Sequence, residues 1–218
     1  MKKHKEKTPS PKARAVKTQN PPDEPPDTPA PASAASLLTI GHSTRTIEDF
    51  VGMLKAHGVE RLIDVRTIPM SRRNPQFNSD ALKKSVEAEG IAYTHMKNLG
   101  GLRHAKRDSI NTGWRNASFR GYADYMQTPE FAGAIADLIG LAGSKRTAIM
   151  CAEAVPWRCH RSLIADALTA RGIAVEHIMS RSNREPHSTT PFARICGNDV
   201  SYPARQPDVP QSGRLFDE

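Results

Sequence analysis

Short apolar runs that alternate with amphipathic helical segments are the feature that most constrains the fold of this chain. The runs lie at residues 37–40, 61–65, 91–96, 147–151 and 174–178, and each has the length of a buried strand. Strands that are separated by helices require right-handed crossovers, so they lie parallel in one sheet with helices on both faces. The pattern therefore predicts an α/β fold, a three-layer open sheet of about five mostly parallel strands.

The helices between these strands have recognisable starts and stops. Ile47, Phe50, Val51 and Leu54 recur at helical spacing, and Thr46 with Asp49 forms a capping pair in front of them. Further helices are expected at 79–89, within 122–141 and at 160–171. Glycines at positions 58, 90 and 172 are placed to end three of the helices.

The composition changes at both ends of this alternating region. Residues 1–36 are dominated by Lys, Pro, Thr, Ala and Ser, which predicts a disordered basic and Pro-rich tail. After residue 179 apolar residues are scattered, so residues 180–218 are expected to form a mostly irregular C-terminal tail. The hydrophobic fraction of 38% lies below the roughly 45–50% of an average globular chain, and the two tails account for this dilution. The organisation predicted is a single domain at residues 37–179.

Charge and cysteine content limit the environment and the partners. A formal net charge of +8 favours an anionic partner, either a small molecule or a nucleic acid. Three cysteines in a chain of 218 residues do not form a disulfide framework. The sequence has no run of about 18 apolar residues and no apolar stretch near Met1, so neither a membrane span nor a secretory signal is expected. We therefore expect a cytoplasmic protein.

Polar side chains follow four of the predicted strands. His42 and Ser43 follow the first strand, Asp64 and Arg66 end the second, and Glu153 follows the fourth; the third carries a tyrosine and a histidine. In open α/β sheets ligands bind beyond the carboxyl ends of the strands. These residues predict a shared cleft, although a solvated polar rim would have a similar composition.

The segment 151–161 contains the densest set of reactive side chains. Pro156 disfavours helix at the residue before it, so the next helix is expected to start near Cys159 or His160. A helix N-terminus and the neighbouring Arg158 would stabilise a thiolate on Cys159. For Cys151, burial as a small apolar side chain is an equally good interpretation.

Roles follow from these residue types. Nucleophilic and proton-transfer roles are assigned to the cysteines and their titratable neighbours, and anion-binding roles to arginines and the polar residues beside them. The catalytic candidates are Cys151, Glu153, Cys159, His160 and His42, and the substrate-binding candidates are Ser43, Asp64, Arg66, Arg72 and Arg161. For Arg72 a solvated surface loop is an equal alternative.

A divalent metal is a second use of the same side chains. Cys151, Cys159 and His160, joined by His42 or Glu153, are suitable ligand types, but their spacing matches no standard zinc module. Whether a cofactor is present stays open at this level.

Several separated segments together resemble the bacterial and archaeal domain of unknown function 488 family. They are residues 39–43, 64–66 with Pro69 and the Ser-Arg pair 71–72, 99–101, 151–153 and 159–161. The resemblance spans about residues 37–179 and implies a cytosolic α/β protein, while the family name records that no reaction was assigned. It singles out as motif positions His42, Asp64, Arg66, Cys151, Glu153, Cys159, His160 and Arg161.

Three functional hypotheses follow. The first is an enzyme acting on an anionic substrate, phosphate-bearing or derived from nucleic acid, as a cysteine-dependent transferase or hydrolase. The second is a non-catalytic thiol or metal sensor, and the third is a nucleic-acid-associated binding module. In addition, residues 211–216 weakly resemble the peptide with which bacterial DNA-metabolism proteins bind the sliding clamp, although the spacing is one residue longer.

Overall fold

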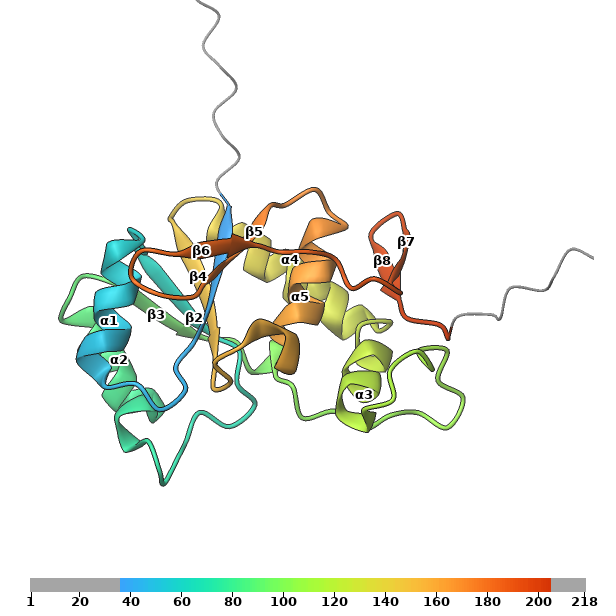
Figure 1. Ribbon diagram of the computed structural model, residues 1–218, viewed down its shortest axis with the longest axis horizontal. Helices are drawn as coiled ribbons and strands as arrows, with labels where there is room; N and C mark the ends of the chain where they lie inside the picture. The colour runs from blue at the N-terminus through green and yellow to red at the C-terminus, as the bar shows by residue number, and fades with distance from the viewer. Residues whose placement is uncertain (1–35, 205–218) are drawn as a thin grey trace, which may run out of the picture. The chain divides into compact units, whose positions relative to one another are not determined.

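The computed structural model describes residues 36–204, which form eight strands, five α-helices and three short 3-10 turns (Figure 1). In chain order the elements are β1 (Leu37–Gly41), α1 (Ile47–Ala56), β2 (Arg61–Asp64), η1 (Pro75–Phe77), α2 (Ser79–Glu87), β3 (Ala92–His95), η2 (Lys97–Leu99), α3 (Ala117–Tyr125), α4 (Pro129–Ala142), β4 (Thr147–Cys151), η3 (Pro156–Arg158), α5 (Arg161–Thr169), β5 (Val175–Ile178), β6 (Arg184–Pro186), β7 (Arg194–Cys196) and β8 (Asp199–Ser201).

One mixed sheet of six strands forms the centre of the fold. Its order is β3-β2-β4-β1-β5-β6, with the first five strands parallel and β6 antiparallel to β5. The innermost strands, β4 and β1, are buried along their whole length, as expected for parallel strands covered on both faces. The predicted α/β class is confirmed, with one more strand than expected.

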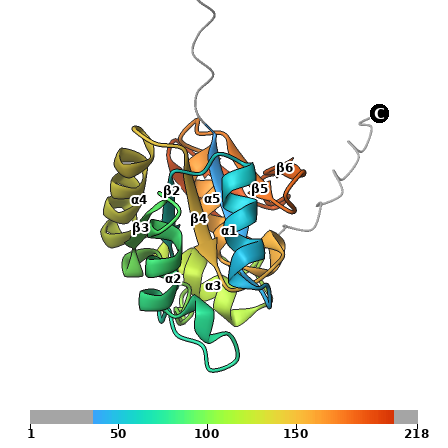
Figure 2. The same ribbon diagram turned by 90° about the vertical axis from the view of Figure 1, so that its left-hand side faces the viewer.

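Helices cover both faces of this sheet, and each face has its own apolar core. On one face, Phe50 and Leu54 of α1 and Leu82 of α2 pack with Leu38 of β1. On the other face, residues of α3, α4 and α5 pack with Leu37, Ile63 and Ile149, which point the opposite way. Figure 1 shows α1 and α2 to the left of the strands and α4 and α5 to their right, and Figure 2 gives the view at right angles.

The predicted helix signals appear in the structure. The Thr46 side chain accepts a hydrogen bond from the Asp49 amide at the start of α1. Gly58, Gly90 and Gly172 all follow helix ends and have positive φ angles, which glycine adopts without steric cost.

The folded domain continues past residue 179, which corrects the predicted domain boundary. β6 extends the main sheet, and β7 and β8 form a small antiparallel hairpin. Val200 and Tyr202 are buried in the core beside α5, and the Tyr202 hydroxyl donates a hydrogen bond to Asp166. Residues 180–204 were expected to be irregular because their three strands are only three residues long and contribute few apolar side chains. The N-terminal tail and the clamp-like segment 211–216 lie outside the described residues.

Within residues 36–204, no helix has both the length and the apolar character needed to cross a membrane.

Candidate active site

The carboxyl ends of β1, β2 and β4 bring the predicted site residues together. Gly41 is in register with Cys151, and Asp64 is in register with Met150. Two adjoining pockets open at this edge, with volumes of about 380 and 520 Å³. The smaller one, which contains both cysteines, is called the cysteine pocket here, and the larger one, lined by His42, the histidine pocket. Residues 66, 68, 152, 153 and 158 line both.

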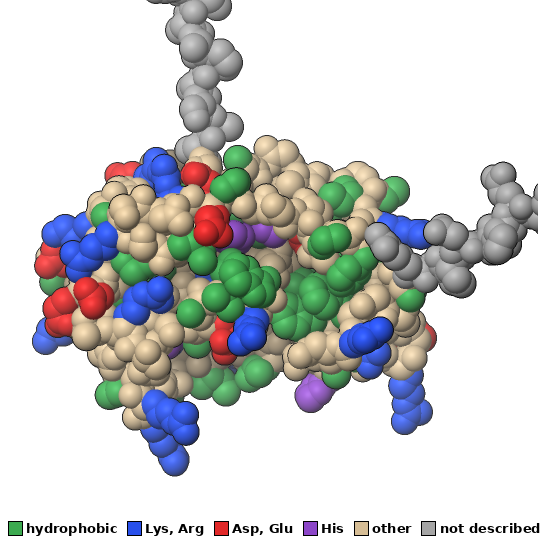
Figure 3. Space-filling view, in the orientation of Figure 1, with side chains coloured by type: hydrophobic (Ala, Val, Ile, Leu, Met, Phe, Trp, Pro, Cys, Tyr) green, Lys and Arg blue, Asp and Glu red, His purple; other side chains and the backbone are tan. Residues whose placement is uncertain are grey.

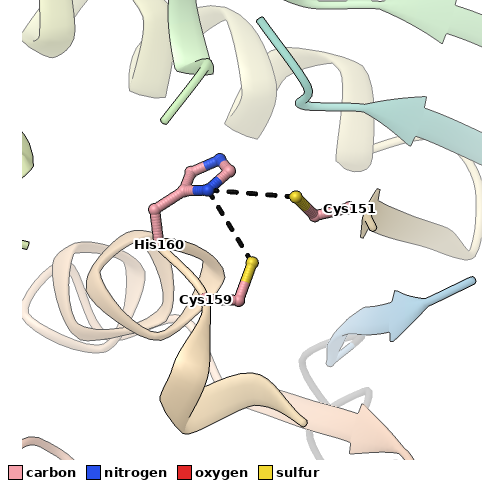
Figure 4. A group of neighbouring side chains, drawn as sticks. All are labelled: Cys151, Cys159 and His160. Carbon is pink, nitrogen blue, oxygen red and sulfur yellow. Dashed lines mark hydrogen bonds between the residues drawn. The ribbon is translucent and has the colours of Figure 1, made fainter. Parts of the chain in front are cut away.

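Three side chains form a compact group beside the cysteine pocket (Figure 4). Cys151 ends β4, and Cys159 and His160 lie between η3 and α5. The Nδ1 atom of His160 is 3.9 Å from the Cys151 sulfur and 3.7 Å from the Cys159 sulfur. These three atoms all lie within 4.8 Å of one another. One of the sulfurs can act as a nucleophile with the other two side chains beside it, or all three atoms can be ligands of one metal ion.

The orientation of His160 is fixed from its far side. Its Nε2 atom lies 3.1 Å from the Val65 carbonyl oxygen, and because a carbonyl only accepts, Nε2 carries a proton. Nδ1 is thereby left to face the two sulfurs. Gly101 packs against the same ring, where a Cβ atom would lie 2.5 Å from Nδ1. The His160 ring therefore requires glycine at position 101, the second residue of the Gly100-Gly101 pair.

The two thiols differ in acidity. The pKa of Cys159 is held well below its usual value by a hydrogen bond from the Cys151 thiol and by His160 and Arg161, against the opposing effect of burial. The pKa of Cys151 is raised by that same hydrogen bond to Cys159 and by burial. In this arrangement Cys159 is the more acidic of the two thiols, and Cys151 donates to its sulfur. Both sulfur-bearing side chains are buried and line the cysteine pocket.

Arg161 lies beneath the site rather than in it. Its side chain is 1% exposed, and it donates from Nε to the Cys159 sulfur, from Nη1 to the Thr39 hydroxyl and from Nη2 to the Glu153 carbonyl oxygen. Gly41 permits this approach, because a Cβ atom there would lie 1.8 Å from that carbonyl oxygen. The predicted role of Arg161 in substrate binding is therefore corrected. It lines neither pocket and contacts the Cys159 sulfur instead.

Asp64 and Arg66 form a buried ion pair at the end of β2. Arg66 Nη2 lies 2.5 Å from one carboxylate oxygen of Asp64, and Nε lies 2.9 Å from the other. Arg66 also donates to the Phe77 carbonyl oxygen, and its Nη1 is 3.4 Å from His42 Nε2. Arg66 lines both pockets, whereas Asp64 is fully buried and reaches neither, so its expected contact with substrate is corrected to orientation of Arg66.

His42 is a neutral side chain of the histidine pocket. Burial lowers its pKa to about 4, and its ring stacks on Phe77 with a centroid distance of 4.2 Å. Nδ1 donates to the Ser43 carbonyl oxygen, so Nε2 is free to accept from Arg66. Ser43 has a φ of 51°, a left-handed conformation that is uncommon for a residue other than glycine.

The predicted residues therefore separate into groups. The cysteine pocket collects Cys151, Glu153, Cys159, His160 and Arg66, and the histidine pocket collects His42, Ser43, Glu153 and Arg66. Arg72 is exposed on the loop before η1 and lines neither pocket, which corrects its expected role. His42 is likewise absent from the three-ligand group.

Arg158 is a pocket-lining side chain that the sequence assignment left out of the site. It is exposed, lines both pockets and has no ion-pair partner among residues 36–204. The only sequence signal for it was its position next to Cys159.

Comparison with known proteins places this site in a family. A family model described as "Domain of unknown function DUF488" matches residues 46–168, more than half of the chain. No curated protein and no solved structure matches the chain significantly. The match begins at the cap of α1 and ends within α5, so it includes Asp64, Arg66 and the whole of η3 with its flanking cysteines. The chain therefore belongs to the DUF488 family.

Proposed function

We propose that this protein is an enzyme in which the Cys159 thiolate attacks the electrophilic centre of an anionic substrate and displaces a leaving group from it, as in a cysteine-dependent transferase or hydrolase. The observation that carries the proposal is the environment of Arg161. This guanidinium is almost completely buried, and none of its three hydrogen-bond acceptors is a carboxylate. Of the three, only the Cys159 sulfur can become an anion.

A buried charge without a counter-charge is strongly unfavourable, so the contact between Arg161 and Cys159 favours the ionised thiol. A thiolate is the nucleophilic form of cysteine. The Cys151 thiol and the His160 ring lie on the pocket side of the same sulfur, where they can donate to it or accept a proton during a reaction. Glu153 lines the same pocket and is assigned to proton transfer with the substrate.

The substrate class follows from the cations that line the pockets. The charge of Arg66 is matched by Asp64, whereas Arg158 has no such partner among the described residues. A guanidinium at the mouth of a pocket favours phosphate or carboxylate groups. We therefore infer an anionic substrate, phosphate-bearing or derived from nucleic acid, that binds Arg158 with its electrophilic centre near Cys159.

Alkylation with iodoacetamide tests the thiolate. Site-resolved mass spectrometry would follow Cys159 and Cys196 in one sample, and Cys196 is an exposed cysteine on β7 that serves as internal reference. We expect the rate at Cys159 to reach half its maximum at a lower pH than the rate at Cys196, because the thiolate is the reactive form. If the two rates rise together with pH, the proposal is wrong.

Inorganic phosphate tests the anion site in the same assay. Phosphate bound at Arg158 should slow alkylation of Cys159 in the wild type and in Arg72→Gln, whose guanidinium lies outside both pockets. In Arg158→Gln the protection should weaken, and added salt should reduce it less than in the wild type. Equal protection in both variants would contradict an anion site at Arg158.

A metal centre is a second candidate, favoured by the three-ligand group. Zinc bonds of about 2.3 Å to sulfur and about 2.0–2.1 Å to nitrogen separate these atoms by about 3.6 Å in a tetrahedral site. The observed distances of 3.7 and 3.9 Å are close to this value, and the proton on His160 Nε2 leaves Nδ1 available. Elemental analysis of the purified protein decides between the candidates. Stoichiometric zinc that is lost in Cys159→Ser but kept in Cys196→Ser would favour the metal centre.

A further inference from the structure

A second network of buried polar side chains runs from Arg161 away from the cysteine pocket. The Thr39 hydroxyl lies 2.8 Å from Nδ1 of His177, and Nε2 of His177 lies 3.1 Å from Nδ1 of His187. Nε2 of His187 lies 2.9 Å from the carboxylate of Asp166. Thr39 also accepts from Arg161, so five side chains from β1, β5, α5 and the segment after β6 form one continuous chain.

The two ends of this chain fix the direction of two hydrogen bonds. Arg161 can only donate, so the Thr39 oxygen accepts from it, and the Asp166 carboxylate accepts from Nε2 of His187. With one proton on each imidazole, Nδ1 of His187 accepts from Nε2 of His177, and Nδ1 of His177 accepts from the Thr39 hydroxyl, so the whole chain has one orientation. Burial is the largest cause that lowers the pKa of His177 to about 4, which agrees with a neutral His177 ring.

The end of the chain is held firmly. Asp166 is fully buried and also accepts from the Tyr202 hydroxyl and from the amide and hydroxyl of Thr190. His177 and His187 line a pocket of about 500 Å³. The space-filling view shows a hollow near the centre of one face, flanked by hydrophobic and histidine side chains (Figure 3). The two imidazoles therefore lie between a surface pocket and the arginine beneath the reactive sulfur.

We propose that Thr39, His177, His187 and Asp166 are positioning residues that hold the Arg161 guanidinium against the Cys159 sulfur. This inference rests on the proposed function, in which Arg161 favours the ionised form of the Cys159 thiol. Arg161 has no carboxylate partner of its own within residues 36–204, so the oriented dipoles of the chain and the buried carboxylate at its end stabilise the guanidinium in this position. The residues act through Arg161 and do not contact the substrate.

Thr39→Val tests this role, since it removes the hydroxyl while nearly keeping the shape of the side chain. We expect the alkylation rate at Cys159 near neutral pH to fall about fivefold or more, and its pH profile to shift upward, because the members of one network are energetically coupled. Cys196 should be unaffected. Thr39→Ser restores a hydroxyl and should keep the wild-type profile.

Tyr202→Phe is the matched control, because it removes a buried hydrogen bond to Asp166 but leaves the chain to Arg161 intact. It should leave the Cys159 profile unchanged. If Thr39→Val behaves like Tyr202→Phe, or if Thr39→Ser fails to restore the profile, the positioning role is overturned.

Nitrogen NMR of the imidazole rings in the wild type gives an independent measurement. Both His177 and His187 should be neutral near pH 7 with the proton on Nε2, and a proton on Nδ1 of either ring would overturn the chain. This measurement needs no variant to fold. It also separates the two proposals. A Cys159 alkylation rate that rises with pH together with the rate at Cys196 would refute the proposed function, whereas the positions of the imidazole protons test the hydrogen-bonded chain independently of Cys159.

Discussion

At the scale of single residues, two buried arginines are stabilised in different ways. Arg66 shares a two-point contact with the Asp64 carboxylate, and a backbone carbonyl and a neutral histidine accept from its remaining groups. In the described part of the chain, Arg161 has only one acceptor that can ionise, which is Cys159. The first arrangement fixes the end of β2, whereas the second makes an ionised thiol favourable. The partner, rather than the arginine itself, determines which role each position has.

Asp64→Asn should destabilise the protein strongly. The substitution removes the charge that compensates Arg66, and breaking a buried ion pair at one partner costs about 3–5 kcal/mol. Denaturant unfolding measures this loss. Asp49→Asn is the control, because Asp49 pairs with Arg181 at the surface and such pairs contribute about 0–1 kcal/mol. Similar small losses in both variants would show that Arg66 finds another counter-charge.

At the scale of elements, the sequence predicted the parts of the fold that depend on local pattern. The β4 range and the start of α2 agree with the prediction, and the Thr46 cap of α1 has the expected contact. These features follow from apolar periodicity and from side chains within a few residues of one another. β6, β7 and β8 are too short to show a period, and they form because the chain returns to β5 and α5.

The same distinction explains the site. Convergence of His42, Asp64 and Cys151 follows from parallel strands, whose carboxyl ends meet at one edge. The sequence could not show that Arg161 turns under the pocket while Arg158 lines it, or that Arg72 points to solvent. The direction of a long side chain is decided by tertiary contacts, such as the Glu153 carbonyl oxygen that accepts from Arg161.

The C-terminal segment should be required for stability, and Tyr202→Ala measures its contribution. Tyr202 is fully buried against α5, so truncation leaves a cavity and removes the hydrogen bond to Asp166. Loss of a buried aromatic side chain costs about 3–5 kcal/mol in the free energy of unfolding. Ile195→Ala on β7 is the control. Ile195 is 47% exposed, so its truncation should cost no more than about 1 kcal/mol. Equal effects would mean that Tyr202 does not contribute to the core.

At the scale of the whole molecule, the pockets differ in the charged side chains that line them. The cysteine and histidine pockets both contain Arg66, Arg158 and Glu153, whereas Glu185 is the charged side chain at the pocket lined by His177 and His187. Because Asp64 compensates Arg66, Arg158 is the cation that we expect an anion to contact in the first two pockets. The formal net charge of +8 for the whole chain also favours an anionic partner.

Stability of the whole protein should fall as the pH decreases from 6.5 to 4. Burial lowers the pKa of both His42 and His177 from 6.5 to about 4. Within this window the unfolded chain binds protons at these histidines and the folded protein does not. The stabilisation from the two neutral histidines is therefore complete above their pKa in the unfolded chain. It is lost as the pH falls, and it stops decreasing below their pKa in the folded protein. Each group contributes up to about 1.4 kcal/mol per pH unit.

Denaturant unfolding at several pH values between 7 and 4 would measure this slope. In His42→Gln the slope should be about half as steep, because one of two proton-binding groups is removed. His104→Gln should retain the wild-type slope, since the His104 side chain is exposed and meets water in both states. A free energy of unfolding that stays constant over this range in the wild type would show that both rings accept protons in the folded protein. That result would also remove the neutral His177 on which the orientation of the buried chain to Arg161 depends.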